Sequence, residues 1–246
     1  MPTSRQAGLA LVTALCLWTG GAQALTYAEC TALVERSPGD GYKAATTWAK
    51  TTDDPGAQHC AALAEVALQR YGDAADRLNR LVDQTANPYE AAALLGQLGN
   101  VRMLDGKADL AVDAFTRALK NTPNDPQMLA DRARAFAALG QWARAARDLD
   151  GAVQIDDEDP ELYLLYATAL REAGKIADAR GAVEKALRLA PNAPEVLLER
   201  GRIRLIDGDR KGAAADWKTV ADSAPKGPVR DAALASLKAL EKTKGK

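Results

Sequence analysis

A repeat with a period of 34 residues constrains the fold of this chain more than any other feature. Four segments align at this period without gaps, and they are 92–125, 126–159, 160–193 and 194–227. Position 15 of each segment is glycine, position 20 is alanine, position 24 is large and apolar, and position 27 is small. In chain order these residues are Gly106, Gly140, Gly174 and Gly208; Ala111, Ala145, Ala179 and Ala213; Phe115, Leu149, Val183 and Trp217; and Ala118, Ala152, Ala186 and Val220. A repeat of this length predicts units that stack on copies of themselves.

Each unit is predicted to be a helix–turn–helix. Two stretches of about a dozen residues with helical apolar periodicity flank the glycine at position 15, and glycine permits the left-handed backbone that ends a helix. Proline stands at position 1 as Pro126, Pro160 and Pro194, and again as Pro228, where its missing N–H fits a first helical turn. Small residues at positions 20 and 27 allow the helices to approach closely.

These residues resemble the tetratricopeptide repeat (TPR) family over 92–227, and more weakly over the remainder of residues 25–246. The resemblance implies an all-α fold: a right-handed superhelical solenoid of antiparallel helix pairs. Position 8 departs from the family pattern, because Gly99 and Gly201 match it but Ala133 and Ala167 replace glycine. Arginines at position 7 of two units, Arg132 and Arg200, are expected to snorkel or to line a surface.

The flanking segments are predicted to form the ends of the array. Residues 25–91 form two divergent TPR-like hairpins, the first with helices at Tyr27–Arg36 and Tyr42–Lys50 joined by a turn over Ser37–Gly41, with Trp48 in the role of position 24. The second, 58–91, has Arg77 where the other units have alanine. Residues 228–246 are predicted to supply a capping helix, Val229–Lys242, and a basic tail.

Residues 1–24 are predicted to be a cleaved signal peptide. Arg5, the apolar run 8–18 and Ala22-Gln23-Ala24 follow the order of a secretory signal. An uncleaved anchor or a buried helix is the alternative, although the run is short for a membrane span. The expected location is therefore the periplasm, with no stable membrane insertion after cleavage.

Cleavage after Ala24 would leave two cysteines, Cys30 and Cys60. An even pair in an exported protein predicts one disulfide. The resemblance places both on first helices of consecutive units, which lie side by side in this architecture. Two buried free thiols, or a catalytic thiol pair, are the alternatives.

Composition argues against several classes of function. Lys and Arg number 32 against 33 Asp and Glu, so charge gives no reason to expect a nucleic-acid partner. A single histidine and unclustered cysteines predict no metal site and no cofactor. We therefore predict a protein that is not an enzyme. An enzyme that uses Cys30, His59 and Cys60 is kept as the alternative of another class.

The resemblance also implies that first helices line a concave groove that binds peptides. The candidate groove residues are Gln97, Asn100, Asp131, Arg134, Thr168, Arg171, Glu199 and Arg202. The leading hypothesis is an exported scaffold or adaptor that holds a protein or peptide partner during envelope assembly. An accessory role in cytochrome c maturation, or elsewhere in envelope biogenesis, is the alternative. The sequence predicts neither the partner nor the oligomeric state.

Overall fold

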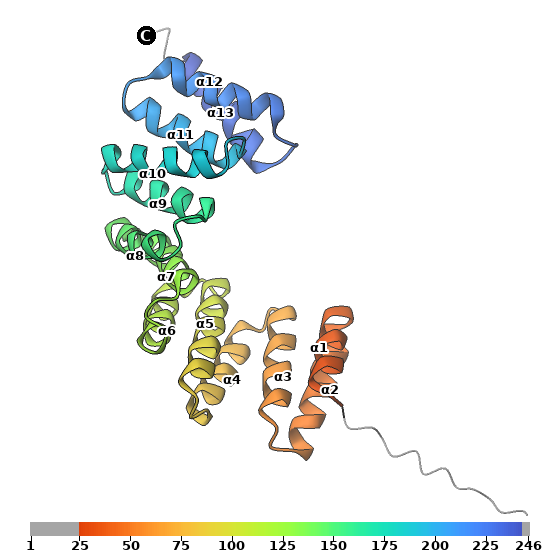
Figure 1. The fold of residues 1–246 in the computed structure, drawn as a ribbon. Helices are drawn as coiled ribbons and strands as arrows, with labels where there is room; N and C mark the ends of the chain where they lie inside the picture. Colours follow the sequence, from red (N-terminus) through yellow and green to blue (C-terminus); the bar gives the residue numbers. More distant parts are fainter. Residues whose placement is uncertain (1–24, 243–246) are drawn as a thin grey trace, which may run out of the picture.

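The computed structural model describes residues 25–242, and within them every regular element is an α-helix (Figure 1). The predicted signal peptide, 1–24, lies outside the described residues. Consecutive helices form pairs, each with a first and a second helix. The last described helix has no second helix of its own and packs against the preceding pair. Their bounds are α1 Tyr27–Arg36, α2 Pro38–Thr51, α3 Pro55–Ala67, α4 Tyr71–Gln84, α5 Pro88–Leu104, α6 Ala108–Asn121, α7 Pro126–Ala138, α8 Trp142–Ile155, α9 Pro160–Glu172, α10 Ile176–Leu189, α11 Pro194–Ile206, α12 Arg210–Ser223 and α13 Pro228–Lys242. The predicted all-helical TPR solenoid is confirmed.

The helix ends use the residues that the repeat places there. Each first helix from α3 to α11, and also α13, begins on proline. The side chains of Asp54, Asn87 and Asp159 accept a hydrogen bond from a backbone N–H of the first turn of α3, α5 and α9. The glycines at position 15 adopt φ values from 69° to 87°, the left-handed region in which a side chain would be strained. The connections within the regular units are therefore tight and alike.

In the core of the regular units, the side chain at position 24 packs against the residue at position 8. A Cβ atom on Gly99 would run into the ring of Phe115, and one on Gly201 would run into Trp217. Both rings are buried, and the Trp217 indole N–H donates to the backbone carbonyl of Leu198 at 3.2 Å. Close approach of the first helix to these rings therefore requires glycine at position 8.

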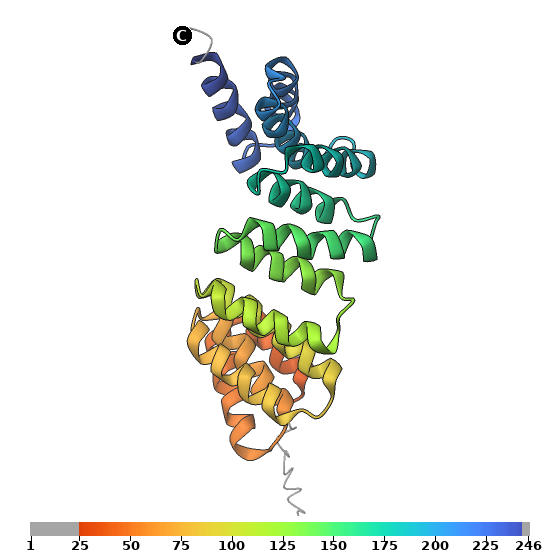
Figure 2. The same cartoon turned by 90° about the vertical axis from the view of Figure 1, so that its left-hand side faces the viewer.

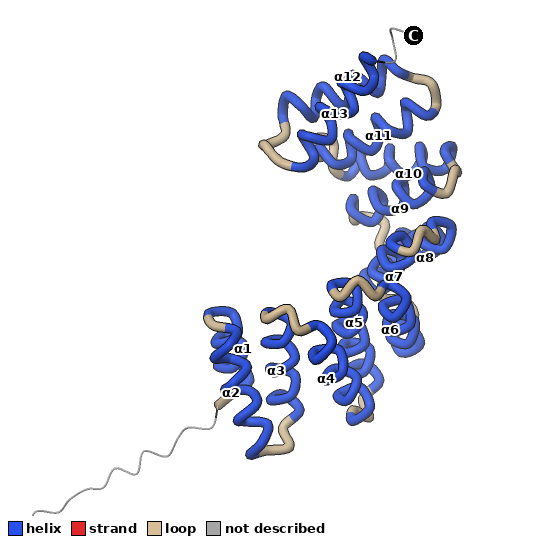
Figure 3. The backbone as a smooth tube through the Cα atoms, turned by 180° about the vertical axis from the view of Figure 1, so that it is seen from behind, coloured by secondary structure: helices blue, strands red, loops and turns tan. Residues whose placement is uncertain are grey.

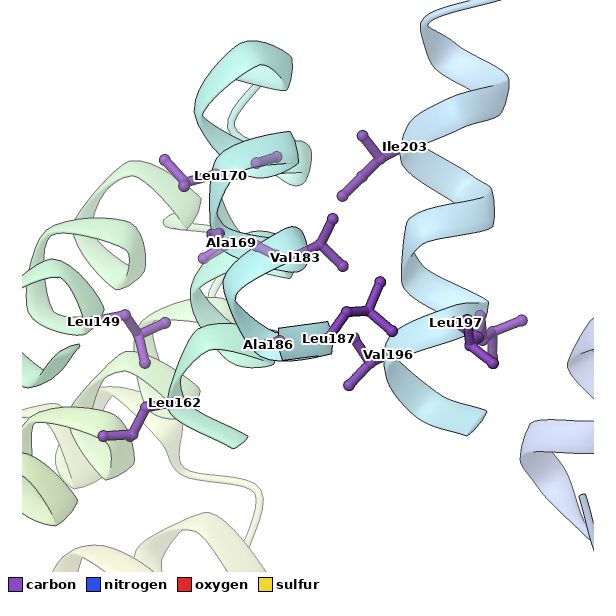
Figure 4. Close-up of a cluster of buried hydrophobic side chains, with 14 of the residues drawn as sticks. Leu149, Leu162, Ala169, Leu170, Val183, Ala186, Leu187, Val196, Leu197 and Ile203 are labelled. Atoms are coloured by element: carbon purple, nitrogen blue, oxygen red, sulfur yellow. The ribbon is translucent and has the colours of Figure 1, made fainter. Parts of the chain in front are cut away.

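Where position 8 is alanine, position 24 carries a smaller side chain. Ala133 and Ala167 share their units with Leu149 and Val183, and all four are buried. Figure 4 shows the result between α8 and α11, where short aliphatic side chains interleave and Val183 points toward Ile203. The units therefore fill their interior either with glycine and an aromatic ring or with alanine and a smaller aliphatic side chain.

The first hairpin is joined to the second by a disulfide. Cys30 of α1 and Cys60 of α3 are bonded, with their Cα atoms 6.3 Å apart, and both residues are fully buried. This confirms the predicted pairing. The bond joins first helices of consecutive units at the end of the array where the repeat pattern is weakest.

The predicted start of the second helix of the first hairpin was wrong. The residues assigned to a turn, 37–41, contain only one residue between helices, Ser37, because α2 begins at Pro38. Proline fits the first helical turn, and the Ser37 hydroxyl donates to the Asp40 carboxylate at 2.8 Å. Gly41 lies inside the helix, where a Cβ would collide with Val34 of α1. That glycine therefore serves close helix packing and not a turn.

The arginines at position 7 do not snorkel to an open surface. Arg132 binds Asp148 of the second helix of its unit through two hydrogen bonds, of 2.7 and 2.8 Å. Arg200 binds Asp216 in the same way, at 3.0 and 2.7 Å. Both aspartates are buried. These bidentate pairs cross-link the two helices of a unit, a role that the sequence did not predict. Arg200 also lines a surface pocket, as expected.

The second hairpin has an ion pair of its own at different positions. Glu65 occupies position 8 and is 1% exposed, and its two carboxylate oxygens accept from Arg77 at 2.9 and 2.7 Å. Arg77 occupies position 20, where the regular units have alanine. A charged pair thus replaces the glycine and alanine of the repeat pattern.

The stacked hairpins form an arc (Figures 1 and 3). The second helices α6 and α8 lie on its outer side, and α5 and α7 lie on its inner side. Figure 2 shows the units from α7 to α12 in layers one above another, with α13 beside α12. Between residues 25 and 242, no helix combines the length and the apolar character needed to cross a membrane.

Candidate binding groove

Apolar pockets lie between neighbouring units of the array. A pocket of about 320 Å³ lies between α3 and α5, and one of about 140 Å³ between α7 and α9. Another, of about 370 Å³, lies between α9 and α11, and one of about 550 Å³ is bounded by α11, α12 and α13. These four pockets are together called the groove here.

The pocket between α3 and α5, called here the α3–α5 pocket, draws on four helices. Its apolar walls come from α4 and α5, and its polar groups come from α1, α3 and α5. The lining residues are Tyr27, Pro55, Gly56, His59, Leu81, Glu90, Ala93, Leu94 and Gln97. Helix α5 supplies Glu90 because it begins at Pro88, four residues before the repeat pattern places the start of its unit.

A chain of hydrogen bonds connects three first helices at this pocket. The Nε2 atom of His59 lies 2.6 Å from Oε1 of Gln97, an oxygen that can only accept, so Nε2 carries a proton. In the neutral ring Nδ1 is then the acceptor, and it receives the Tyr27 hydroxyl at 2.6 Å. The two rings stack with centroids 5.7 Å apart. Burial raises the pKa of the Tyr27 phenol, which favours the protonated form that donates.

In the middle of the groove, Arg134 is held by two carboxylates. Its guanidinium donates to Asp131 at 2.6 Å and to Glu161 of the next unit at 2.7 Å. Thr168 donates its hydroxyl to the carbonyl of Leu164 in its own helix. Arg134 and Thr168 both line the small α7–α9 pocket. The arginine therefore stands at the edge of an apolar recess with part of its hydrogen-bonding capacity already used.

Toward the C-terminal end, Glu199 is buried and organises the polar residues around it. The residue is 1% exposed and accepts from Arg171 at 2.5 Å and from Arg202 at 3.1 Å. Burial lowers the pKa of the Arg171 guanidinium, but its bonds to Glu199 and Glu172 outweigh that effect and leave the pKa raised. Glu199 is thus a fixed counter-ion inside the wall, and Arg202 is the member of this cluster that lines a pocket.

The eight predicted groove residues lie on α5, α7, α9 and α11. Asn100 is exposed, and Gln97 lines the α3–α5 pocket. Sequence reasoning missed Tyr27, Glu90 and Ala93 of that pocket. The signal that could have found Glu90 and Ala93 is Asn87-Pro88, a capping residue followed by a helix-starting proline, which begins α5 early.

The residues of the alternative enzyme hypothesis are already engaged. Cys30 and Cys60 are bonded to each other, so neither sulfur is present as a thiol. Both ring nitrogens of His59 make hydrogen bonds to side chains. Within the described part of the chain, no group of three or more His, Cys, Asp or Glu side chains is arranged to hold a metal ion.

Sequence comparison agrees with the architecture. Family models described as tetratricopeptide repeat match residues 61–126, 97–160 and 136–200, and together they span 61–200. The chain belongs to the tetratricopeptide repeat family.

Curated relatives share part of this region. The heat-shock protein cognate co-chaperone sgt12 of Aspergillus fumigatus is 29% identical over 129 residues, which is 51% of this chain and 38% of that protein. RNA polymerase II-associated protein 3 of Mus musculus is 29% identical over 136 residues, which is 55% of this chain and 21% of that protein. The chain therefore matches well under half of the length of either relative.

Solved structures match over more of the chain. YrrB, a TPR protein with an unusual peptide-binding site, has a TM-score of 0.63 at 16% identity, covering 87% of this chain and 100% of the other. The C-terminal part of a TPR protein from Cytophaga hutchinsonii has a TM-score of 0.67 at 17% identity, covering 80% and 78%. At these identities the likeness shows the shared fold.

Proposed function

We propose that this chain is a protein–protein interaction scaffold that holds a segment of a partner protein in its groove. The observation that carries the proposal is the series of apolar pockets between neighbouring units, with hydrogen-bonded polar side chains beside them. Such a surface suits an extended or helical segment with several apolar side chains. The peptide-binding site of YrrB, which shares the fold, supports the idea. No covalent chemistry is part of the proposal.

We further propose that the scaffold acts in the periplasm, in envelope assembly, after removal of residues 1–24. The secretory pattern of that segment supports export, and so does the disulfide, because such bonds persist in oxidising compartments. Cell fractionation tests this directly. A mature chain that begins at Leu25 in the periplasmic fraction is expected, and retention of the full-length chain in the cytoplasm would contradict it.

The groove is tested by site-specific photo-cross-linking in the source cell. A photo-reactive residue at Asn100, exposed on α5, is compared with one at Lys120, exposed on the second helix α6. The proposal predicts a discrete cross-linked partner from position 100 and none from position 120. Equal cross-linking at both positions, or cross-linking at position 120 alone, would place the interaction away from the groove.

The captured segment then allows a test of the groove arginine. Arg134→Gln should weaken binding of that segment, with loss of folding free energy below about 1 kcal/mol because the arginine is partly exposed. Arg180→Gln is the matched control: Arg180 is also exposed and ion-paired, with Asp207 at 3.2 Å, but lies on the second helix α10. An equal effect of both variants on binding would argue against a role specific to Arg134.

A further inference from the structure

We infer that the α3–α5 pocket binds one aromatic side chain of the partner segment, and that the residues beside this side chain in the partner are basic. The inference rests on the proposed function, because the pocket is part of the groove. It adds the chemistry by which one end of the groove would select its partner.

The size of the pocket suits a single large side chain. Its volume of about 320 Å³ lies at the lower limit of ligand pockets, which begin near roughly 300 Å³. Leu81, Ala93 and Leu94 supply apolar walls. Ala93 is exposed and Tyr27 is 41% exposed, so the pocket is accessible from solvent.

Two aromatic rings, Tyr27 and His59, line the pocket. Tyr27 and His59 form a stacked pair, and their polar atoms are already engaged with each other and with Gln97. Aromatic pairs add favourable geometry to the burial of apolar area. An aromatic ring therefore gains more here than an aliphatic side chain of similar size.

The walls are held in place before any ligand arrives. The hydrogen-bond chain joins α1, α3 and α5, and Cys60, the residue after His59, is bonded to Cys30 of α1. A preformed pocket loses little conformational entropy on binding, which favours recognition of a short segment.

The charge around the pocket favours a basic partner. Glu90 is the charged residue among those that line it, and Asp53 and Asp54, both exposed, precede α3. Glu90 accepts from Thr85 at 2.6 Å and remains exposed. On a larger scale, residues 25–100, which contain the pocket, have 10 Asp and Glu against 6 Lys and Arg. This negative balance attracts basic segments to the pocket.

His59 makes the inference testable, because it is the single histidine in the sequence and its ring protons give an isolated NMR signal. The chain 25–246, with its disulfide intact, is titrated with the acetylated and amidated tripeptide Lys-Trp-Lys. A saturable shift of the His59 ring signal is expected. Lys-Ala-Lys should bind at least about tenfold more weakly, since the aromatic burial is lost. Glu-Trp-Glu should bind about two- to fivefold more weakly.

Two variants test whether the shift of the His59 signal reports binding in the α3–α5 pocket. Ala93→Leu should fill the space and weaken Lys-Trp-Lys at least about fivefold, whereas Ala177→Leu, at an exposed site on α10, should leave binding unchanged. Glu90→Gln should reduce the preference for Lys-Trp-Lys over Glu-Trp-Glu. No saturable shift, equal binding of the three peptides, or no effect of Ala93→Leu would each overturn the inference. Cross-linking from Asn100 that persists in Ala93→Leu, with the peptide titration negative, would leave the groove proposal intact and reject only the pocket.

Discussion

The first two hairpins and the four regular units solve the same packing problem by different means. In residues 92–227 the helices of a unit approach through glycine or alanine at position 8, and the size of position 24 varies to match. In the second hairpin a buried Glu65–Arg77 pair occupies positions 8 and 20. A disulfide holds the first hairpin to it.

This difference shows what repetition provides. A regular unit gains stability from similar contacts with both neighbours, and small residues at fixed positions allow that close packing. Among the described residues, the first hairpin packs against a neighbouring unit on one side, and a covalent bond and specific polar contacts supplement this packing. The same contacts build the α3–α5 pocket. The irregular end of the array therefore carries a pocket whose lining side chains do not follow the repeat pattern.

Loss of Arg77 should have the largest effect on stability. Arg77→Ala introduces the alanine that the regular units have at position 20, but leaves Glu65 charged and buried. We expect the free energy of unfolding in urea to fall by about 3–5 kcal/mol. Glu65→Ala combined with Arg77→Ala should recover most of this loss. A double variant as unstable as the single one would show that the pair does more than neutralise Glu65.

Removal of the disulfide should come next. Cys30→Ser with Cys60→Ser releases a loop whose ends are 30 residues apart, for which loop entropy predicts a loss of about 3–4 kcal/mol. Calorimetry should detect a lower melting temperature, while far-UV circular dichroism at room temperature stays near that of the parent chain. An unchanged melting temperature would contradict the role assigned to the bond.

The size match between the residues at positions 8 and 24 predicts that disrupting it lowers the free energy of unfolding by an intermediate amount. Gly201→Ala pushes a methyl group into Trp217 and should destabilise the chain by about 1–3 kcal/mol. Combined with Trp217→Leu, which copies the alanine–leucine pair of residues 126–159, the same change should be much less harmful than it is alone. Additive effects in this double-mutant cycle would argue against the matching.

The smallest expected effect on stability comes from the ionisation of two tyrosines, Tyr27 in the first hairpin and Tyr166 in a regular unit. Burial raises the pKa of Tyr27. The pKa of Tyr166 is raised to about 12, mainly by burial and secondly by the hydrogen bond to Asp150. Because the fold favours the protonated phenol, the stability that Tyr166 contributes is complete below pH 10, its unfolded value, and is lost as pH rises through about 12. Tyr166→Phe should remove the last step of an ultraviolet titration. Identical titration curves would contradict this.

The sequence alone predicted the regular units well because every level of their pattern agrees. Apolar periodicity, the glycine at position 15 and the proline at position 1 all indicate the same helix pairs, as does Val229–Lys242 for α13. The start of α2 was missed because Pro38, Gly39 and Gly41 are typical of turns, and only the packing of Gly41 against Val34 explains their place in a helix.

The site was harder to predict because its geometry depends on contacts between distant residues. Gln97 was selected from its repeat position, but its partner His59 lies 38 residues earlier and its role depends on Tyr27, in another hairpin. Glu199 has a groove position in the repeat, and only the structure reveals that it is buried between arginines. Repeat position identifies the helix face, whereas burial and pairing follow from side chains that the repeat does not specify.

We propose that the irregular end of the array selects the partner, whereas the regular units hold that end in place. The most direct test titrates Lys-Trp-Lys against the His59 ring signal in two destabilised variants. Cys30→Ser with Cys60→Ser should weaken the saturable shift at least about fivefold, because α1 and Tyr27 lose their covalent attachment to α3. Gly201→Ala, at the opposite end, should leave it unchanged. Equal weakening in both variants, or in Gly201→Ala alone, would contradict the account.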